Sequence, residues 1–212
     1  PHPLSDNSFE VLPVESTQPV TRYDPLSDSW TLFWRDSGHK MRIRFADDRP
    51  AGNGRRYNDR DDIPIERLSA PELVDIKITS QCPFVMTAAC GKYCYQGSVT
   101  EGVHADYGML LRIFYELGQL KVFEVALGGG EPTVHPKFAR ILSMARSYGI
   151  VPNFTTRNLA WLADAAQREE ILSLAGAFAY SAHSVADIQR LGKTLAKHKV
   201  GARRANLHIV MG

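Results

Sequence analysis

Residues 82–95 read CPFVMTAACGKYCY and contain all three cysteines of the chain, Cys82, Cys90 and Cys94, in the spacing C-x7-C-x3-C. An apolar, strand-like run precedes this stretch, and the next such run ends in residues 128–132, GGGEP. Three thiolates on one loop can hold three corners of a metal centre and leave a fourth position open, which a substrate or cofactor needs in order to reach the metal. We therefore expect the cysteine loop and the glycine-rich loop to belong to one site.

The composition is that of a globular protein with a balanced charge. The 212 residues are 44% hydrophobic, which suffices for one sizeable core. A net charge of +2 gives no indication of a nucleic-acid or anionic-membrane partner, and no apolar run reaches the roughly 20 residues of a membrane span. The first residues lack the basic and apolar regions of a signal peptide, and three clustered cysteines fit metal ligation better than a disulfide framework. We expect a reducing, cytoplasmic location.

The first 70 residues differ in pattern from the remainder. Residues 1–28 contain five prolines and little periodicity, which predicts an irregular arm. Residues 29–36 and 40–46 alternate in hydrophobicity around turn-forming residues, which predicts a β-hairpin that must pack on something larger. Residues 51–62 form a polar loop, either a solvated face or a source of arginines that contact substrate. We expect one domain over 1–70 (arm, hairpin and polar loop) and a second, the core domain, over 71–212.

From about Leu73 the chain alternates between short apolar runs and amphipathic segments. The predicted strands are residues 74–79, 122–127, 151–155, 177–181 and 206–210, and the predicted helices are 105–117, 137–148, 159–174 and 185–197. Ser184 and Asp187 are placed to cap the last helix. This alternation predicts an α/β fold in which parallel strands are joined by right-handed crossovers.

The unusual residues follow the carboxyl ends of these strands. In parallel α/β folds the loops at those ends line the ligand site. The cysteine loop follows the first strand, and the glycine-rich segment ends the second. Polar or small residues stand in the same place after the remaining three strands: Thr155, Thr156 and Asn158; Ser181 and His183; and Met211 and Gly212.

The cysteine loop is open to three interpretations. The thiolates could ligate three irons of a [4Fe–4S] cluster and leave the fourth iron free. With His104 they could form a closed zinc site of structural function, or they could be unligated buried thiols. A plain electron-transfer cluster would need a fourth cysteine, which the chain lacks. In the second loop, three glycines allow a ligand to approach the backbone, and Glu131 can accept from a cationic amine; the alternative is an ordinary turn.

The three-cysteine loop, the aromatic Tyr95 after its last cysteine and the GGGEP segment resemble the radical S-adenosylmethionine (SAM) superfamily, over about residues 74–212. The usual spacing in that family is C-x3-C-x2-C, so the first gap here is four residues longer and the second one longer. The resemblance implies a partial, TIM-like (β/α) barrel, of which five strands are visible. The barrel is either truncated or completed by the N-terminal hairpin or a partner chain.

The same resemblance implies the chemistry. Cys82, Cys90 and Cys94 would hold a [4Fe–4S] cluster, whose free iron is chelated by SAM. An external one-electron donor, flavodoxin-like or ferredoxin-like, would drive reductive cleavage of SAM to a 5′-deoxyadenosyl radical that abstracts hydrogen from an unknown substrate. The implied cofactor-binding residues are Gly129, Gly130, Glu131, Tyr95, Thr155, Ser181 and His183. Two rival functions remain: a structural zinc-binding interaction module, and a non-catalytic cluster protein of radical-SAM type.

Overall fold

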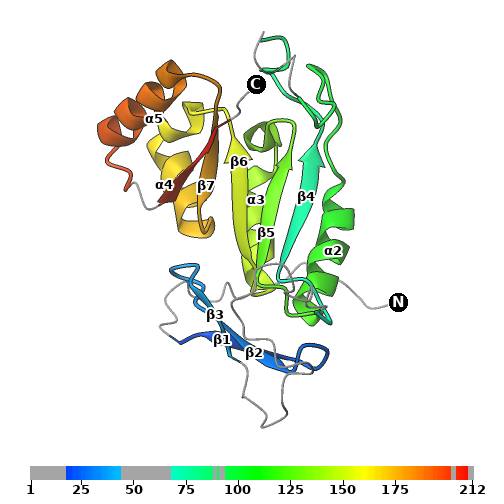
Figure 1. The fold of residues 1–212 in the computed structure, drawn as a ribbon. Helices are drawn as coiled ribbons and strands as arrows, with labels where there is room; N and C mark the ends of the chain where they lie inside the picture. Colours follow the sequence, from blue (N-terminus) through cyan, green and yellow to red (C-terminus); the bar gives the residue numbers. More distant parts are fainter. Residues whose placement is uncertain (1–17, 44–67, 88–89, 91–93, 202–203, 210–212) are drawn as a thin grey trace, which may run out of the picture. The chain divides into compact units, whose positions relative to one another are not determined.

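The computed structural model describes residues 18–43, 68–87, 90, 94–201 and 204–209 (Figure 1). The chain divides into two compact units: a small unit, Glu15–Pro71, and a large unit, Glu72–Gly212 together with Pro1–Val14. The predicted polar loop at 51–62 and the predicted strand-end residues Met211 and Gly212 lie outside the described residues.

The large unit is built on a five-stranded parallel sheet with the strand order β4-β5-β6-β7-β8. Each strand pairs with the strand that follows it in the sequence, which is the order found in a sheet that curves in one direction. The predicted α/β fold class is therefore confirmed. The strands overlap the five predicted apolar runs closely. Their bounds are β4 Leu73–Thr79, β5 Glu124–Gly129, β6 Val151–Thr156, β7 Phe178–Ala182 and β8 Ala205–Ile209.

Within the described residues, four helices that match the predicted ones connect these strands: α2 Tyr107–Gln119, α3 Phe138–Ser147, α4 Ala165–Leu174 and α5 Val185–Lys197. The predicted helix over 159–174 is divided into a short 3-10 turn, η2 Ala160–Leu162, followed by α4. The division falls at Asp164, whose side chain accepts from the backbone N–H of Gln167 at 3.1 Å and caps the new helix. A second 3-10 turn, η1 Pro132–Val134, follows β5.

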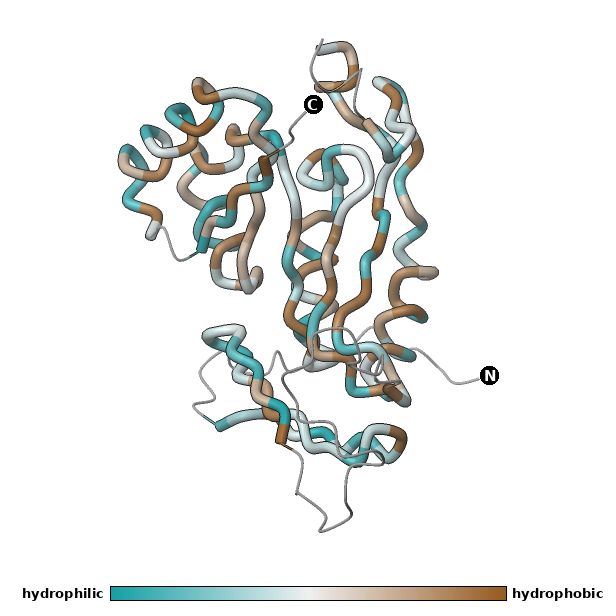
Figure 2. The backbone as a smooth tube through the Cα atoms, viewed as in Figure 1, coloured by the Kyte–Doolittle hydropathy of each residue, from teal (hydrophilic) through white to brown (hydrophobic). Residues whose placement is uncertain are grey.

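The sheet has one apolar face and one face that is largely polar. Ile76 and Ile78 of β4, Leu127 of β5 and Phe154 of β6 are buried in the same cluster as residues of α2 and α3 such as Phe114. The residues that alternate with them are more exposed, and brown and teal positions follow one another along β4 in Figure 2. The helices therefore cover the apolar face, and the opposite face is available to line a site.

The small unit contains a three-stranded antiparallel sheet, β1 Val20–Asp24, β2 Ser29–Phe33 and β3 Lys40–Ile43, in that order. The predicted hairpin corresponds to β2 and β3 and is confirmed, with Trp30 opposite Ile43 on the same face. The prediction of an irregular arm over 1–28 is wrong for residues 20–24, because β1 pairs with β2 over its whole length.

The polar residues of β1 explain why its sequence did not indicate a strand. Arg22 donates to the carbonyl oxygens of Pro71 and Ala70 at 2.9 and 3.1 Å. Asp24 accepts from the backbone and the hydroxyl group of Ser69 at 2.7 and 2.6 Å. The buried face of this strand is therefore held by hydrogen bonds, and an apolar alternation is absent from it.

Among the described residues of the chain, no helix has the length and apolar character that crossing a membrane requires.

Candidate functional site

A cavity of about 760 Å³ opens at the carboxyl ends of the parallel strands. Its walls come from every strand of the large unit's sheet and from the loop that follows β4. The residues that the radical SAM resemblance implies as cluster and cofactor ligands all line this cavity: Cys82, Cys90, Cys94, Tyr95, Gly129, Gly130, Glu131, Thr155, Ser181 and His183. Residues that are far apart in the sequence thus meet at one location, as their positions at the strand ends predicted.

The three thiols are free and lie close enough to influence one another. Burial raises the pKa of the Cys82 thiol, and the negative charges of Glu131, Cys90 and Cys94 raise it further. Burial acts in the same direction on Cys94, but hydrogen bonds from Ser98 and neighbouring backbone groups outweigh it and lower the pKa of that thiol. Cys94 is therefore the more readily ionised of the two.

The donor set suits a thiolate-ligated centre, although the sulfurs are not arranged around one. Within the described part of the chain, no three Cys, His, Asp or Glu side chains are gathered closely enough to hold a metal ion. Three soft thiolates are the ligands that iron–sulfur clusters and zinc prefer. The three thiols are therefore the side chains that would hold such a group.

The glycine-rich segment lies directly against the chain that leads into Cys82. The N–H of Gly130 donates to the carbonyl oxygen of Thr79 at 2.7 Å, and the N–H of Glu131 donates to that of Gln81 at 2.8 Å. A Cβ atom at Gly130 would lie 2.1 Å from the carbonyl oxygen of Gln81, which no side chain tolerates. The contact joins the second loop to the first and so couples the two predicted motifs in space.

Gly129 and Gly128 differ in what they allow. Gly129 has φ +116°, and a Cβ atom there would lie 2.2 Å from the carbonyl oxygen of Thr79, so both conformation and space require glycine at this position. Gly128 lines the cavity and has open space where a side chain would be. The sequence predicted that the glycines would let a ligand approach the backbone. In the structure, Gly129 and Gly130 instead allow close contact with the backbone of Thr79 and Gln81, at and just after the end of β4. Gly128 faces the open cavity.

The carboxylate of Glu131 is 1% exposed and accepts five hydrogen bonds from the protein. Oε1 accepts from the N–H and hydroxyl of Thr133 at 3.2 and 2.7 Å and from the hydroxyl of Thr156 at 2.7 Å. Oε2 accepts from the N–H groups of Arg157 and Asn158 at 2.8 and 3.1 Å. Burial raises the pKa of Glu131, and these hydrogen bonds oppose that effect. Glu131 thus ties the end of β5 to the end of β6.

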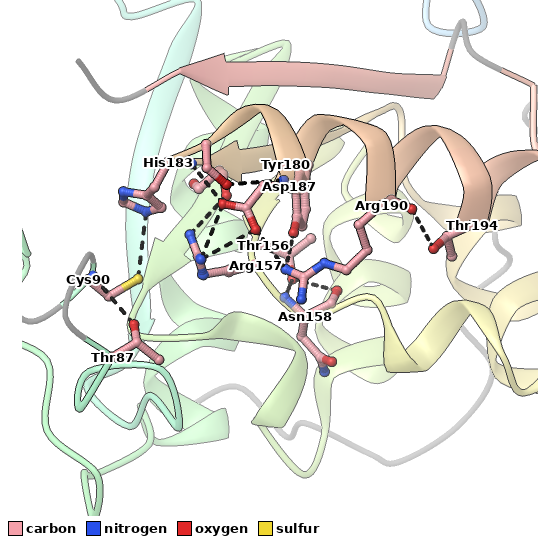
Figure 3. A network of polar contacts seen from close by, with 12 residues as sticks. Thr87, Cys90, Thr156, Arg157, Asn158, Tyr180, His183, Asp187, Arg190 and Thr194 are labelled. Carbon is pink, nitrogen blue, oxygen red and sulfur yellow. Dashed lines mark hydrogen bonds and ion pairs between the residues drawn. The ribbon is translucent and has the colours of Figure 1, made fainter.

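A network of charged groups supports the far wall of the cavity (Figure 3). The carboxylate of Asp187 pairs with Arg157 at 3.3 Å and with Arg190 at 3.1 Å. The predicted helix cap is confirmed, since the hydroxyl of Ser184 accepts from the N–H of Asp187 at 3.2 Å. Burial opposes ionisation of Asp187, but the hydrogen bond from the N–H of His183 and the charge of Arg157 lower its pKa. The carboxylate is therefore charged at neutral pH.

Sequence reasoning missed the arginines of this network. Arg157 lines the cavity, and its guanidinium group also donates to the carbonyl oxygen of Ser181 at 3.4 Å. A lone arginine in the strand-end sequence TTRN gives no indication of its partner, because Asp187 is 30 residues away. The sequence identified Asp187 only as a helix-capping residue.

His183 lines the cavity after β7 and contacts the cysteine loop. Its Nε2 is 3.6 Å from Sγ of Cys90. Burial and the charge of Arg157 lower the pKa of His183, while Asp187 opposes them. The neutral imidazole is thus the main form near pH 7.

The other predicted residues vary in exposure, and one lies away from the cavity. Tyr95 lines the cavity but is 91% exposed, while the other two lining residues, Thr155 and Ser181, are half-buried. His104, the fourth ligand in the zinc interpretation, is not among the residues that line the cavity; its ring packs against that of His135 at 4.8 Å. The structure therefore gives the zinc interpretation no support through His104.

Comparison with known proteins identifies a shared fold. No family model matches the sequence, and no curated protein matches it. The structure of Streptococcus suis SuiB bound to S-adenosylmethionine aligns with 93% of this chain and 63% of its own, with a TM-score of 0.56 and 13% identity. BtrN in complex with AdoMet and 2-DOIA aligns with 66% of this chain and 57% of its own, with a TM-score of 0.47 and 16% identity. The chain thus spans less than two thirds of either protein.

Proposed function

We propose that this chain is a radical SAM enzyme, which binds a [4Fe–4S] cluster and S-adenosylmethionine in the cavity at the strand ends. The observation that carries the proposal is the meeting of two distant motifs: the three cysteines and the GGGE segment line one cavity and are joined by backbone hydrogen bonds. The fold shared with SuiB, which was solved bound to S-adenosylmethionine, agrees with it.

The thiolates of Cys82, Cys90 and Cys94 would hold the cluster. When bound, such a cluster supplies the electron that breaks the C5′–S bond of S-adenosylmethionine, giving the 5′-deoxyadenosyl radical that abstracts hydrogen from the substrate. The protein's own contribution is to position the reactants and to exclude water and oxygen. An external one-electron donor of flavodoxin or ferredoxin type would reduce the loaded protein.

The glycine loop and the polar strand ends would bind S-adenosylmethionine. Gly128 offers open space beside the backbone. The carboxylate of Glu131, in contrast, already accepts hydrogen bonds from donors of the protein. We therefore assign amine recognition to backbone carbonyl groups of this loop and the positioning of that loop to Glu131. Thr155 and Ser181 line the cavity and offer hydroxyl groups for the ribose or carboxylate.

The test is anaerobic reconstitution with iron and sulfide, followed by addition of dithionite and S-adenosylmethionine. We expect about four irons and four sulfides per chain, as a [4Fe–4S] cluster requires, and release of 5′-deoxyadenosine. Cys94→Ala should lose most of the iron and sulfide, while His104→Gln, the matched control outside the cavity, should load fully.

The rival functions give different results in the same experiment. A zinc module would bind zinc stoichiometrically, fail to retain iron and sulfide, and lose its metal in the His104→Gln protein. A non-catalytic cluster protein would load iron and sulfide but release no 5′-deoxyadenosine. Full iron and sulfide retention by Cys94→Ala would contradict the assignment of the ligands.

A further inference from the structure

His183 and Cys90 form a contact that the proposed ligand assignments do not use. Nε2 of His183 lies 3.6 Å from Sγ of Cys90, and Figure 3 shows the imidazole ring directed at the sulfur. The two residues are 93 positions apart and line the same cavity, His183 after β7 and Cys90 in the loop after β4. The contact places a nitrogen donor beside one of the three candidate cluster ligands.

The backbone that carries His183 is fixed from the first turn of α5. The N–H of His183 donates to Oδ2 of Asp187 at 3.0 Å. That carboxylate is held in turn by Arg157 and Arg190, at 3.3 and 3.1 Å. Ser184 caps the same turn through the N–H of Asp187. The backbone at His183 is therefore held at the junction between β7 and α5 by bonds that do not involve the cysteine loop.

The direction of the hydrogen bond follows from the chemistry of the sulfur. A thiolate bound to iron has no proton to donate, so in the loaded protein a hydrogen bond between the two atoms requires the proton to be on Nε2 of His183. A hydrogen bond to a cluster sulfur withdraws electron density from it and favours the reduced, more negative state.

We propose that His183 is a fourth protein group of the cluster site, which donates a hydrogen bond from Nε2 to the sulfur of Cys90 and raises the reduction potential of the cluster. The inference rests on the proposed function for its effect on the cluster and on the observed contact for its geometry. His183 is thus a positioning and tuning residue, where the sequence suggested a contact to S-adenosylmethionine.

The first experiment measures the cluster. His183→Leu removes the donor, His183→Gln keeps an N–H at similar reach, and His208→Leu on the neighbouring strand is the matched control, because His208 is exposed and is not among the residues that line the cavity. After reconstitution, all variants should bind the parent's amounts of iron and sulfide. An EPR-monitored redox titration should give a more negative midpoint potential for His183→Leu, a smaller shift for His183→Gln and none for His208→Leu.

The second experiment needs no cluster. In the metal-free protein the imidazole of His183 lies against the sulfur of Cys90, so its removal in His183→Leu should change the rate of Cys90 alkylation by iodoacetamide several-fold, measured by mass spectrometry of each cysteine. Cys82 and Cys94 serve as internal controls and should react at the parent's rates. This result tests the contact even if the parent protein binds no cluster. In that case the proposed function fails, and the alkylation rates alone decide whether the contact exists.

Three results would overturn the inference. An unchanged midpoint potential in fully loaded His183→Leu, or an unchanged rate of Cys90 alkylation, would show that the hydrogen bond is not made. Loss of iron in both His183→Leu and His183→Gln would assign His183 as an iron ligand, which contradicts donation to sulfur.

Discussion

Gly130 shows at the scale of one residue how closely the two loops are joined. A Cβ atom there would lie 2.1 Å from the carbonyl oxygen and 2.6 Å from the carbonyl carbon of Gln81, both of them backbone atoms that cannot turn aside. We expect Gly130→Ala to reduce the free energy of unfolding by about 2 kcal/mol or more, the range of strongly strained substitutions. Urea unfolding followed by circular dichroism measures the change.

Gly128→Ala is the matched control for that substitution. Gly128 stands two residues earlier in the same segment and has nothing within 4 Å of its Cβ position. Its replacement should change the free energy of unfolding by less than about 0.5 kcal/mol. Equal losses in the two variants would show that the glycine segment does not lie against the backbone at Gln81.

For individual residues, the sequence was enough to select the candidate site residues but not to predict the partners that they contact. The cysteines, the glycines and the strand-end polar residues could be selected because parallel strands bring their carboxyl ends together. Their partners could not be predicted, because a sequence does not give distances. Glu131 is the example: its residue type predicts an acceptor, but only the fold shows that Thr156 and Arg157, more than 20 residues away, supply the donors.

At the scale of elements, Thr156 joins the end of β6 to Glu131 and to its own exit turn. Its hydroxyl donates to Glu131 at 2.7 Å and accepts from the N–H of Asn158 at 2.9 Å, and the side chain is buried. Thr156→Val keeps the shape but removes one of the five hydrogen bonds to the buried Glu131 carboxylate and one of the two acceptors of the Asn158 N–H. We expect a loss of about 1–3 kcal/mol in the free energy of unfolding, measured by urea denaturation.

Thr155→Val provides the comparison, since strand alternation places Thr155 on the other face of β6. Thr155 lines the cavity and is half-buried. Its replacement should alter the free energy of unfolding by less than about 0.5 kcal/mol, the usual effect away from buried polar networks. If Thr155→Val destabilised the protein as much as Thr156→Val, this would argue against the role of Glu131 in tying the end of β5 to the end of β6.

The elements themselves were predictable where packing is apolar and unpredictable where it is polar. The strands of the large unit were found because Ile76, Leu127 and Phe154 recur in short apolar runs that bury against helices. β1 was missed because its buried residues, Arg22 and Asp24, are those that usually face water. The pattern that identifies a strand is a pattern of hydrophobicity, so a strand held by hydrogen bonds escapes it.

The whole molecule combines these two kinds of packing in its two units. The large unit buries a continuous apolar cluster under its parallel sheet. In the small unit, Arg22, Asp24, Ser29 and Thr31 are among the most deeply buried of the described residues. Hydrogen bonds to charged groups depend on ionisation, whereas apolar burial does not. The stability of the small unit should therefore respond to pH through Asp24 in particular.

Asp24 supplies the last prediction. Burial opposes its ionisation, but hydrogen bonds from Ser69, Ser27 and Leu26 outweigh that effect and lower the pKa to about 2. A carboxyl group whose pKa is lowered by folding stabilises the fold above its unfolded pKa, so this contribution of about 1–2 kcal/mol is complete above pH 5 and is lost as pH falls from about 4 to about 2. Asp24→Asn should show the loss at pH 7 already, and its difference from the parent should shrink as the pH is lowered through that range.

Hydrogen exchange of peptides from residues 20–43, corrected for the intrinsic effect of pH on exchange, measures this difference within the small unit. The control is Asp28→Asn, because Asp28 lies in the exposed turn after β1 and its bond to the hydroxyl of Tyr23 is also exposed. Exposed pairs contribute little, so the control should keep the parent's protection to within about 0.5 kcal/mol at every pH. A parent and an Asp24→Asn protein that differ equally at pH 7 and pH 2 would show that the lost interaction does not depend on charge, and the small unit would then be held by the geometry of its hydrogen bonds alone.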